Sequence, residues 1–423
     1  MNSPCSEKKE RTYAVIDLKS FYASCECADR GLDIFSTPLV VADKERTLNT
    51  IVMSVTPYLK EKFGVPNVCR LRDVPEVRGM IYATPRMAYY IDMSAKVVSI
   101  LLDFVAEEDL HVYSIDESFI RIDPYLRAAK ATAEEFCGRI LKRIKDELGL
   151  VATAGIGPNM FLAKICLDNE AKKKPPYIAY WHYEDVPTKL WSITPITKIW
   201  GIADGIATRL YRLGIRNLEA LAKAEIKTLE KEFGIMGNQL KNLANGIDEA
   251  NIEEKYEPRE RNLSIGQTLM KDYDIKGAKL VLREMNDDLC ARLRKMGQKC
   301  GCVSVYVGYS AKEGGGFSRQ SSLNISADDN FSLFEAVESL YEKHVENLPI
   351  RGLGIGFTKL TSAQTQQYSL FESPSETNER ARLCRAIDRI HSIFGENSVL
   401  RASSLLADST ARARHGQIGG HRA

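Results

Sequence analysis

Three acidic residues have the surroundings expected of a metal-dependent active site. Asp17 ends the apolar run YAVID, and the adjacent acids Asp116 and Glu117 lie between apolar residues in YSIDESFIRID. An unpaired buried carboxylate is energetically costly, so such a group normally binds a cation or a metal ion. If the two runs form neighbouring strands, the three carboxylates converge on one oxygen-rich site that suits Mg²⁺. The alternative is that Asp116 and Glu117 form an exposed turn.

A pair of Mg²⁺ ions at such a site would have a defined chemistry. Two ions about 3.5 to 4 Å apart activate an attacking hydroxyl and stabilise a leaving pyrophosphate. Zinc is not expected, because the six histidines are scattered without metal-ligand spacing. The closest cysteine pairs are CxC rather than CxxC, so we expect reduced, mostly buried thiols.

The elements that must position these acids alternate between strand and helix. The expected elements are strands at 13–17, 38–43 and 151–157, a strand pair at 111–123, and helices at 20–31, 89–107 and 133–148. Between residue 43 and about residue 85 the pattern shortens to a strand, TIVMSV, and a helix, PYLKEKFGV, ending at Gly64. We therefore expect an α/β core that carries a small insertion.

Three further parts follow this core. Short helices separated by glycine turns continue from Pro187 through Gly246 and predict a second, helical domain. The segment EEKYEPRERN is charged and poor in apolar residues, as expected of an extended linker. Residues 262–360 then read β-α-β-β-α-β, a split βαβ unit. The polar and arginine-rich stretch beyond Phe371 is expected to be the most mobile part.

Composition narrows the class of protein further. A chain of 423 residues is too long for one hydrophobic core, and 44% hydrophobic with 27% charged residues is typical of a soluble globular protein. The net charge of +2 neither demands nor forbids a polyanionic partner. No stretch approaches the roughly 18 apolar residues that span a bilayer, so we expect a cytoplasmic protein with no membrane partner.

The two acidic runs also carry a resemblance. YAVIDLKSFYASCE closely resembles the first motif of the Y-family DNA polymerases, and YSIDES resembles their SIDE motif, in the same order and with the expected spacing. The resemblance covers nearly the whole chain and is strongest to the UmuC-like branch, of the Gram-positive bacterial or phage-borne type. It implies an α/β and α+β multidomain, right-hand polymerase with a ferredoxin-like palm. The implied parts are the palm (1–33 and 86–185), fingers (34–85), helical thumb with a helix-hairpin-helix (186–250), linker (251–261), split βαβ little finger (262–365), and clamp-binding peptide with C-terminal tail (366–423).

The activity implied by this resemblance is template-dependent DNA synthesis. The enzyme would add dNTPs to a primer 3′-OH by two-metal-ion nucleotidyl transfer, with primer–template DNA as its partner. Such synthesis is translesional and error-prone, in DNA damage tolerance and the SOS response. Asp17, Asp116 and Glu117 would be catalytic and, with the Leu18 carbonyl, would bind the two Mg²⁺ ions.

The resemblance also assigns residues to the incoming dNTP. Tyr22 would be the steric gate under the sugar, while the neighbouring Phe21 would contact the dNTP or belong to the helix core. Tyr58 matches the position whose hydroxyl touches the triphosphate, and Lys164 matches the lysine for the terminal phosphates. An ordinary surface lysine is the alternative for Lys164.

One position departs from the family pattern. The family often has arginine three residues after Tyr58, where this chain has Glu61, flanked by Lys60 and Lys62. The triphosphate contacts of this helix are therefore open. Each of the two lysines is more typical of a solvated helix charge than of a ligand.

Two segments are expected to contact DNA. TKIWGIADGIATRLYRLGI resembles a helix-hairpin-helix whose turn, with Gly201 and Gly205, binds a phosphate, although Ala203 stands where the family usually has glycine. A plain αα-hairpin is the alternative. Arg319 and Gln320, after a GGG turn, are candidates for phosphate contact or else an exposed strand edge.

The segment QQYSLF resembles the peptide that binds the bacterial sliding clamp. Leu370 and Phe371 would anchor it in an apolar pocket, with Gln367 fixing the orientation. Packing against the little finger is the alternative. The C-terminal tail is a candidate site for an accessory subunit or a recombinase.

Two other functions compete with DNA synthesis. A nucleotide cyclase shares a two-metal α/β palm but needs no thumb or little finger. A catalytically silent DNA-binding subunit would not need all three acids. Primer extension with Mg²⁺ and dNTPs distinguishes these possibilities.

Overall fold

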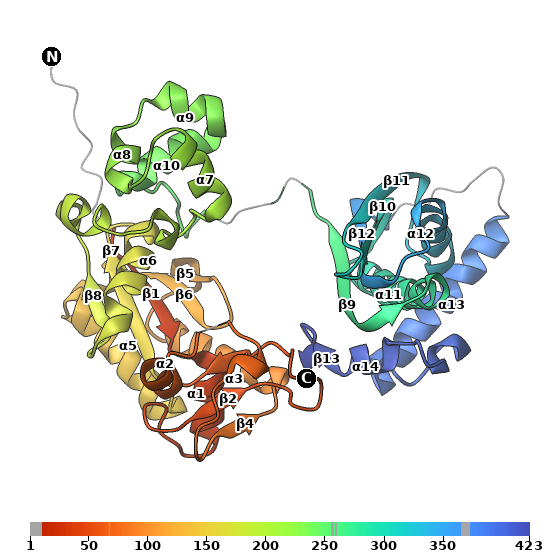
Figure 1. Ribbon diagram of the computed structural model, residues 1–423, viewed down its shortest axis with the longest axis horizontal. Coiled ribbons are helices and arrows are strands. Elements are labelled where there is room, and N and C mark those ends of the chain that lie inside the picture. Colours follow the sequence, from red (N-terminus) through yellow and green to blue (C-terminus); the bar gives the residue numbers. More distant parts are fainter. Residues whose placement is uncertain (1–10, 67, 255–257, 259, 365–372) are drawn as a thin grey trace. The chain divides into compact units, whose positions relative to one another are not determined.

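The computed structural model describes residues 11–66, 68–254, 258, 260–364 and 373–423 (Figure 1). They form two compact units, Met1–Lys255 and Tyr256–Ala423. Among the described residues, no helix combines the length and apolarity that crossing a bilayer requires. The described cysteines are all free thiols, and all but Cys69 are buried, as predicted.

The centre of the first unit is a five-stranded sheet. Its strands, in spatial order, are β5 (Leu110–Val112), β6 (Glu117–Arg121), β1 (Tyr13–Leu18), β7 (Ala152–Gly157) and β8 (Ile178–Tyr180). The middle strand β1 pairs antiparallel with both β6 and β7, and all of its residues are buried. This explains why its sequence is a continuous apolar run interrupted only by Asp17.

Alternate residues of β1 face two different cores. Ala14, Ile16 and Leu18 pack with helices α1, α3 and α5, whereas Tyr13 and Val15 pack with α6. These helices are α1 (Phe21–Asp29), α3 (Met87–Leu102), α5 (Ala133–Leu148) and α6 (Met160–Asn169), with α4 (Asp123–Ala129) preceding α5. Because side chains alternate along a strand, Asp17 belongs to the α6 face.

The helix bounds agree with the prediction at α5 and differ at α3. A capping box of Thr132 and Glu135 begins α5, and Gly149, with φ of 68°, ends it. Helix α3 ends at Leu102, five residues before the predicted end. The apolar pattern continues because half-buried Phe104 packs on the ring of Phe136 from a loop rather than from a helix.

The small insertion has a core of its own. Its three-stranded sheet is ordered β3 (Ser54–Val55), β2 (Leu39–Val41), β4 (Ile81–Ala83), and helix α2 (Pro57–Phe63) follows β3. Helix α2 ends at Gly64, as predicted, but only two residues of TIVMSV form a strand. Short turns of 3-10 or π helix in this unit are η1 (Leu71–Asp73), η2 (Glu107–Asp109), η3 (Ala171–Lys173), η4 (Tyr183–Asp185), η5 (Val186–Leu190) and η6 (Ile196–Lys198).

Four helices complete the first unit: α7 (Asp204–Arg212), α8 (Leu218–Lys223), α9 (Ile226–Phe233) and α10 (Ile235–Ala244). Their apolar residues join one continuous core with α6 and the second face of the sheet. This helical part therefore contributes to the support of the sheet face that holds Asp17.

The second unit contains the predicted β-α-β-β-α-β order. Its elements are β9 (Leu263–Tyr273), α11 (Ile275–Lys295), β10 (Gln298–Tyr309), β11 (Gly316–Ala327), α12 (Asn330–His344) and β12 (Ile350–Ser362). The antiparallel sheet is ordered β11-β10-β12-β9, and both helices pack on one face of it. That face is lined by Val303, Val305 and Val307 opposite Phe357, Ile355 and Leu353.

The expectation of a mobile C-terminal stretch is wrong for residues 373–423. They form α13 (Pro374–Phe394), η7 (Ala402–Leu405), α14 (Ala411–His415) and the hairpin β13 (Gln417–Ile418) and β14 (His421–Arg422). Arg294 of α11 binds Asp388 at 2.6 and 2.8 Å, and the α11 acid Asp287 accepts from Arg401. Charged side chains of this segment, which suggested a solvent-exposed end of the chain, thus form ion pairs with charged side chains of α11.

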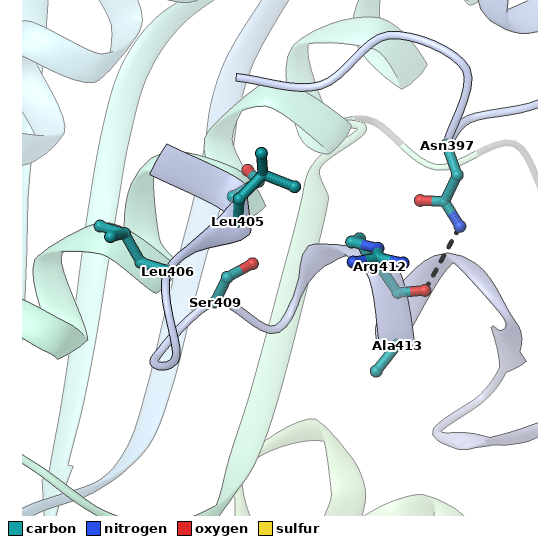
Figure 2. Close-up of a pocket in the computed structure, with 7 residues that line it drawn as sticks. Asn397, Leu405, Leu406, Ser409, Arg412 and Ala413 are labelled. Carbon is teal, nitrogen blue, oxygen red and sulfur yellow. Dashed lines mark hydrogen bonds between the residues drawn. The ribbon is translucent and has the colours of Figure 1, made fainter. Parts of the chain in front are cut away.

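A hollow of about 390 Å³ lies within this C-terminal segment (Figure 2). Its lining residues are Asn397, Ser404, Leu405, Leu406, Ser409, Arg412 and Ala413. Because this lining has no carboxylate, the hollow lacks the ligands that a magnesium-dependent site requires.

Candidate active site

The two acidic runs form neighbouring strands, so their carboxylates do converge. Asp17 of β1 stands directly opposite Glu117 of β6, and the Leu18 amide donates to the Asp116 carbonyl at 2.9 Å. Asp17 and Glu117 are 9% and 8% exposed, and Asp116 is half-buried. A tight turn does occur there, since the Tyr113 and Ser114 amides both donate to the Glu117 carbonyl. Glu117 itself is nevertheless buried, which contradicts the alternative of a wholly exposed turn.

Two lysines neutralise these acids. The Lys172 ammonium lies 2.9 Å from Asp17, and the Lys164 ammonium lies 2.8 Å from Glu117. Asp168, one turn after Lys164 on α6, accepts from both lysines at 3.3 and 2.9 Å. Asp17, Glu117 and Asp168 thus form one network with Lys164 and Lys172 on the α6 face of the sheet.

The structure places Lys172 in the site, which its sequence context did not predict. It lies in KKKPP, a run typical of a domain boundary, whereas Lys164 was expected to bind the terminal phosphates. Lys164 is buried against Glu117, while Lys172 is half-buried beside Asp17. The available signal was the spacing of four residues between Asp168 and Lys172, which places both on one helical face.

The electrostatics of Asp17 favour cation binding. Burial raises the pKa of the Asp17 carboxyl to about 6. The charge of Lys172 lowers this pKa, and the charges of Asp116 and Glu117 raise it by smaller amounts. Burial lowers the pKa of Lys172, but the charges of Asp17 and Asp168 outweigh it and raise the pKa overall. Ionised Asp17 is therefore stabilised only while a positive charge lies beside it.

The gathered carboxylates are suitable ligands for a hard divalent cation. In this structure lysine ammonium groups neutralise the carboxylates instead. Among the described residues, no group of three His, Cys, Asp or Glu side chains is arranged to hold a metal ion as it stands. The donors that do gather are carboxylate oxygens, the ligands that Mg²⁺ prefers. A metal ion would bind where the Lys172 and Lys164 ammonium groups now lie against Asp17 and Glu117.

A second group of cations lies next to this network. The Lys60 ammonium of α2 donates to the Ser20 hydroxyl at 2.8 Å, and the Lys19 ammonium donates to the Lys172 carbonyl at 2.9 Å. Burial lowers the pKa of both lysines, and each is lowered further by the charge of Lys172. Mutual repulsion of this kind creates a site for an anion. The prediction of a solvated charge is wrong for Lys60, whereas Lys62 and Glu61 are exposed.

The aromatic residues after Asp17 divide into core and surface. Phe21 is buried, and Tyr22 is half-buried with its ring centroid 5.0 Å from that of Tyr90. Burial, with a contribution from the Asp116 charge, raises the pKa of Tyr22. Tyr22 thus stands at the edge of the acidic site. Tyr58 is half-buried on α2, with its ring 5.9 Å from that of Phe63.

The residues expected to contact DNA lie in exposed turns and strands. Gly201 has a φ of 90° and nothing lies near its Cα, while Gly205 is in the first turn of α7. Ala203 is the N-cap of α7 with extended backbone, so alanine fits that position. In the second unit, Arg319 and Gln320 are exposed on β11.

Arg319 and Gln320 also line a groove of about 390 Å³ between β11 and α12. Its other lining residues are Ser321, Ala336, Ser339, Leu340, Lys343 and His344. The lining thus includes the cations Arg319 and Lys343 and no acid, which suits contact with a phosphate. The clamp-peptide residues Gln367, Leu370 and Phe371 lie outside the described residues.

Comparison with family models gives two matches. Residues 16–168 match the impB/mucB/samB family, and residues 260–370 match the C-terminal domain of the same family. The first match contains all three acids, and the second contains the β-α-β-β-α-β sheet.

Relatives and solved structures match over most of the chain. The chain is 35% identical to a putative UV-damage repair protein, UvrX, of Bacillus subtilis over 99% of both proteins. It is 32% identical to DNA polymerase IV 2 of the same organism, over 98% of this chain and 99% of that protein. A Y-family DNA polymerase chimera, Dbh-Dpo4(243-245)-Dbh, superimposes with a TM-score of 0.65 at 20% identity, over 83% of this chain and 99% of that one.

Proposed function

Because the chain belongs to the impB/mucB/samB family and has the right-hand fold of the Y-family DNA polymerases, we propose that it is a translesion DNA polymerase. It is a DNA-directed enzyme that adds dNTPs to a primer 3′-OH during the repair of damaged DNA. The relatives named for UV-damage repair and for DNA polymerase IV support this assignment over their full length. Error-prone synthesis within the SOS response is the specific role we infer.

One observation carries the proposal: the register that sets Asp17 opposite Glu117 on adjacent central strands, with Asp116 immediately before it. A rigid sheet holds these oxygens in place, which is what transition-state stabilisation by preorganised charge requires. The three acids carry more negative charge than the two lysines beside them neutralise. Neither a purely structural role nor a simple ion pair explains this excess.

We assign the three acids and the Leu18 carbonyl as ligands of two Mg²⁺ ions. When bound, such ions would lower the pKa of the primer hydroxyl and offset the charge of the leaving pyrophosphate. Asp17 of the central strand and Asp116 and Glu117 of the neighbouring strand and its turn would supply the carboxylate oxygens, and Asp17 and Glu117 are both nearly inaccessible. Lys164, which pairs with Glu117 at 2.8 Å in this structure, is the candidate to bind the terminal phosphates of the substrate.

The triphosphate of the incoming dNTP is assigned to the second group of cations. Lys19, Lys60 and Lys172 lie within electrostatic range of one another and repel. A triphosphate would relieve that repulsion, because neighbouring ammonium groups favour a polyanion. Lys60 thereby supplies the charge that Glu61 does not. Tyr58 on the same helix would add a hydroxyl contact, and Tyr22 would lie under the sugar.

Primer extension tests the proposal directly. Native protein with Mg²⁺, dNTPs and a labelled primer–template should lengthen the primer, whereas Asp116→Ala should be at least about a thousandfold slower, since it removes a metal ligand. Asp92→Ala serves as the control, because it removes an exposed carboxylate of α3 that is paired with Lys96. Absence of extension by the native protein would overturn the assignment.

The sliding clamp is the protein partner that we propose. Leu370 and Phe371 would anchor the peptide and Gln367 would orient it. Pull-down of the clamp should be lost on the double change Leu370→Ala and Phe371→Ala. Retention of the clamp by this variant would reject the assignment without affecting the activity of the enzyme itself.

A further inference from the structure

Three aromatic rings form a triangle beside the acidic site. The ring centroids of Tyr113, Phe119 and Trp200 are 5.5, 5.9 and 6.0 Å apart, separations at which aromatic rings attract one another. Phe119 is buried and Trp200 is half-buried, whereas Tyr113 is 46% exposed. The indole N–H of Trp200 also donates to the Tyr113 hydroxyl at 3.2 Å. Although Tyr113 is exposed, two rings and a hydrogen bond thus fix its position.

Tyr113 begins the turn that carries two of the three acids. The amides of Tyr113 and Ser114 both donate to the Glu117 carbonyl at 3.0 Å. The Ser114 hydroxyl donates to a carboxylate oxygen of Asp116 at 2.8 Å. Phe119 lies two residues after Glu117 on the same strand, so the two side chains belong to the same face of the sheet. The position of the Tyr113 ring therefore bears on both carboxylates of the turn.

Trp200 belongs to the helical part of the first unit. Its neighbours Ile199 and Ile202 are buried in the core that α6 and α7 share, so this core anchors the segment that carries the indole. Gly201, with φ of 90°, follows directly in the turn before α7, the turn that we expect to contact a DNA phosphate. The hydrogen bond between Trp200 and Tyr113 thus joins this turn to the turn of the acids, across 87 residues of sequence.

We propose that Tyr113 and Trp200 are positioning residues that hold the turn of Asp116 and Glu117 in the geometry for metal binding. This inference rests on the proposed function, because it concerns the same site. Groups that orient metal ligands from behind typically contribute about 10- to 100-fold to metal affinity or activity. Neither residue needs to touch the substrate for this effect, since a displacement of about 1 Å at the reacting groups costs about a hundredfold in rate.

A purely structural role makes a different prediction. Three rings at this spacing stabilise the junction between the sheet and the helical part whether or not they affect the acids. In that case loss of the Tyr113 ring would lower the melting temperature and leave the metal affinity of the folded protein unchanged. Metal binding by folded protein therefore distinguishes the two roles.

The experiment measures metal binding without turnover. The full-length protein is mixed with a primer–template duplex that has a dideoxy-terminated primer and with the matching dNTP, and Mn²⁺ is titrated in. Mn²⁺ shares the preference of Mg²⁺ for oxygen ligands, and electron paramagnetic resonance reports its free concentration. Tyr113→Ala should raise the Kd for Mn²⁺ at least about tenfold and lower kcat with an unblocked primer by a similar factor. The Kd for the duplex should stay near the native value.

Two conservative changes test whether the residues act as a pair. Tyr113→Phe and Trp200→Phe each keep an aromatic ring and remove one partner of the same hydrogen bond. Each should raise the Kd for Mn²⁺ about threefold, the share of one hydrogen bond. Because they remove the same interaction, the double variant should be no weaker than either single variant. Both changes are small enough to keep the test valid if Tyr113→Ala does not fold.

Trp191→Phe is the matched control, because it also removes an indole hydrogen bond, to the Ala244 carbonyl at 2.8 Å, in the same helical part. It should bind Mn²⁺ like the native protein. Folded Tyr113→Ala with native affinity for Mn²⁺ would overturn the inference, as would Phe variants whose effects add or are absent. Native protein that fails to extend an unblocked primer would instead overturn the proposed function.

Discussion

At the scale of single residues, the site is a balance between buried acids and the lysines that neutralise them. Asp17 is nearly inaccessible, yet its pKa is only about 6, because Lys172 offsets much of the cost of burial. Lys164 forms the ion pair with Glu117, at 2.8 Å. A metal ion at these carboxylates would take the place of the ammonium groups. The lysines can then turn toward the phosphates without leaving the site.

The ring of Tyr22 is expected to decide which sugar is accepted. Its ring is half-buried with its centroid 5.0 Å from that of Tyr90, and we propose that it lies under the sugar, where a 2′-hydroxyl would clash with it. Tyr22→Ala should therefore raise ribonucleotide incorporation relative to deoxyribonucleotide incorporation by about 10- to 100-fold, the range typical of a steric contact. Single-nucleotide primer extension with matched dNTP and rNTP measures the ratio. Tyr22→Phe retains the ring and should discriminate normally, and equal ratios in all three proteins would contradict the prediction.

Lys60 and Lys62 offer a matched pair on one helix. Lys60 is half-buried and bonded to Ser20, whereas Lys62 is exposed. Lys60→Ala should raise the KM for dNTP about tenfold, equivalent to about 1.4 kcal/mol of binding free energy, with a smaller change in kcat. Lys62→Ala should leave both constants near their native values. Equal effects of the two substitutions would show that the general positive charge of α2, and not the position of Lys60, is responsible.

At the scale of secondary structure elements, sequence patterns located most strands and helices and missed two kinds of feature. The capping box and terminal glycine of α5 are local signals, so its bounds were predictable. The end of α3 was not predictable, because Phe104 continues the apolar pattern of the helix although it packs on Phe136 from a loop. The fixed position of residues 373–423 depends on acids of α11 more than 80 residues away, such as Asp288. Such long-range pairing leaves no periodic trace in the sequence.

The site shows the same division between local and long-range information. The acids Asp17 and Glu117 were identifiable, because charge inside an apolar strand is a local anomaly. The role of Lys172 depends on how α6 and the following turn pack against β1, which a run of three lysines does not reveal. Lys60 was misjudged for the same reason, since its partner Ser20 is 40 residues away.

The docking of α14 onto α11 should depend on pH through His415. The hydrogen bond to Asp288 at 3.0 Å, with help from Glu396, raises the pKa of His415 above 6.5, although burial and Arg414 oppose this. Since the folded-state pKa is raised, protonated His415 stabilises the fold below about pH 6.5, and the contribution is lost as pH rises through the folded pKa. Solvent screening limits it to less than about 1 kcal/mol.

Thermal unfolding of the native protein and of His415→Gln, from about pH 5 to pH 9, checks this contribution. The native protein should be more stable than the variant at the acidic end, and the difference should shrink toward the alkaline end. His421→Gln, in the β14 strand, is the control for a general effect of removing a histidine. A difference between native and variant that is constant across pH would contradict the linkage.

At the scale of the whole molecule, the chain divides where the charged linker was predicted, and each unit has a complete core. The first unit, Met1–Lys255, contains all three acids and the surrounding lysines. The second unit, Tyr256–Ala423, encloses its own core between the four-stranded sheet and helices α11 and α12. The candidate active site and the four-stranded sheet of the second unit thus rest on separate cores.

Expression of the two units as separate proteins should yield two folded fragments, because neither core depends on residues of the other. The first unit alone should retain Mg²⁺-dependent extension but need a DNA concentration at least about tenfold higher, since the contacts of the second unit are lost. Adding the second unit in trans should restore little, because the covalent linker supplies an effective concentration near the millimolar range that micromolar mixing does not reach. Circular dichroism melting of each fragment and primer extension against DNA concentration are the measurements. A first unit that melts without cooperativity, or that extends primers as efficiently as the full chain, would show that the two units do not divide the work in this way.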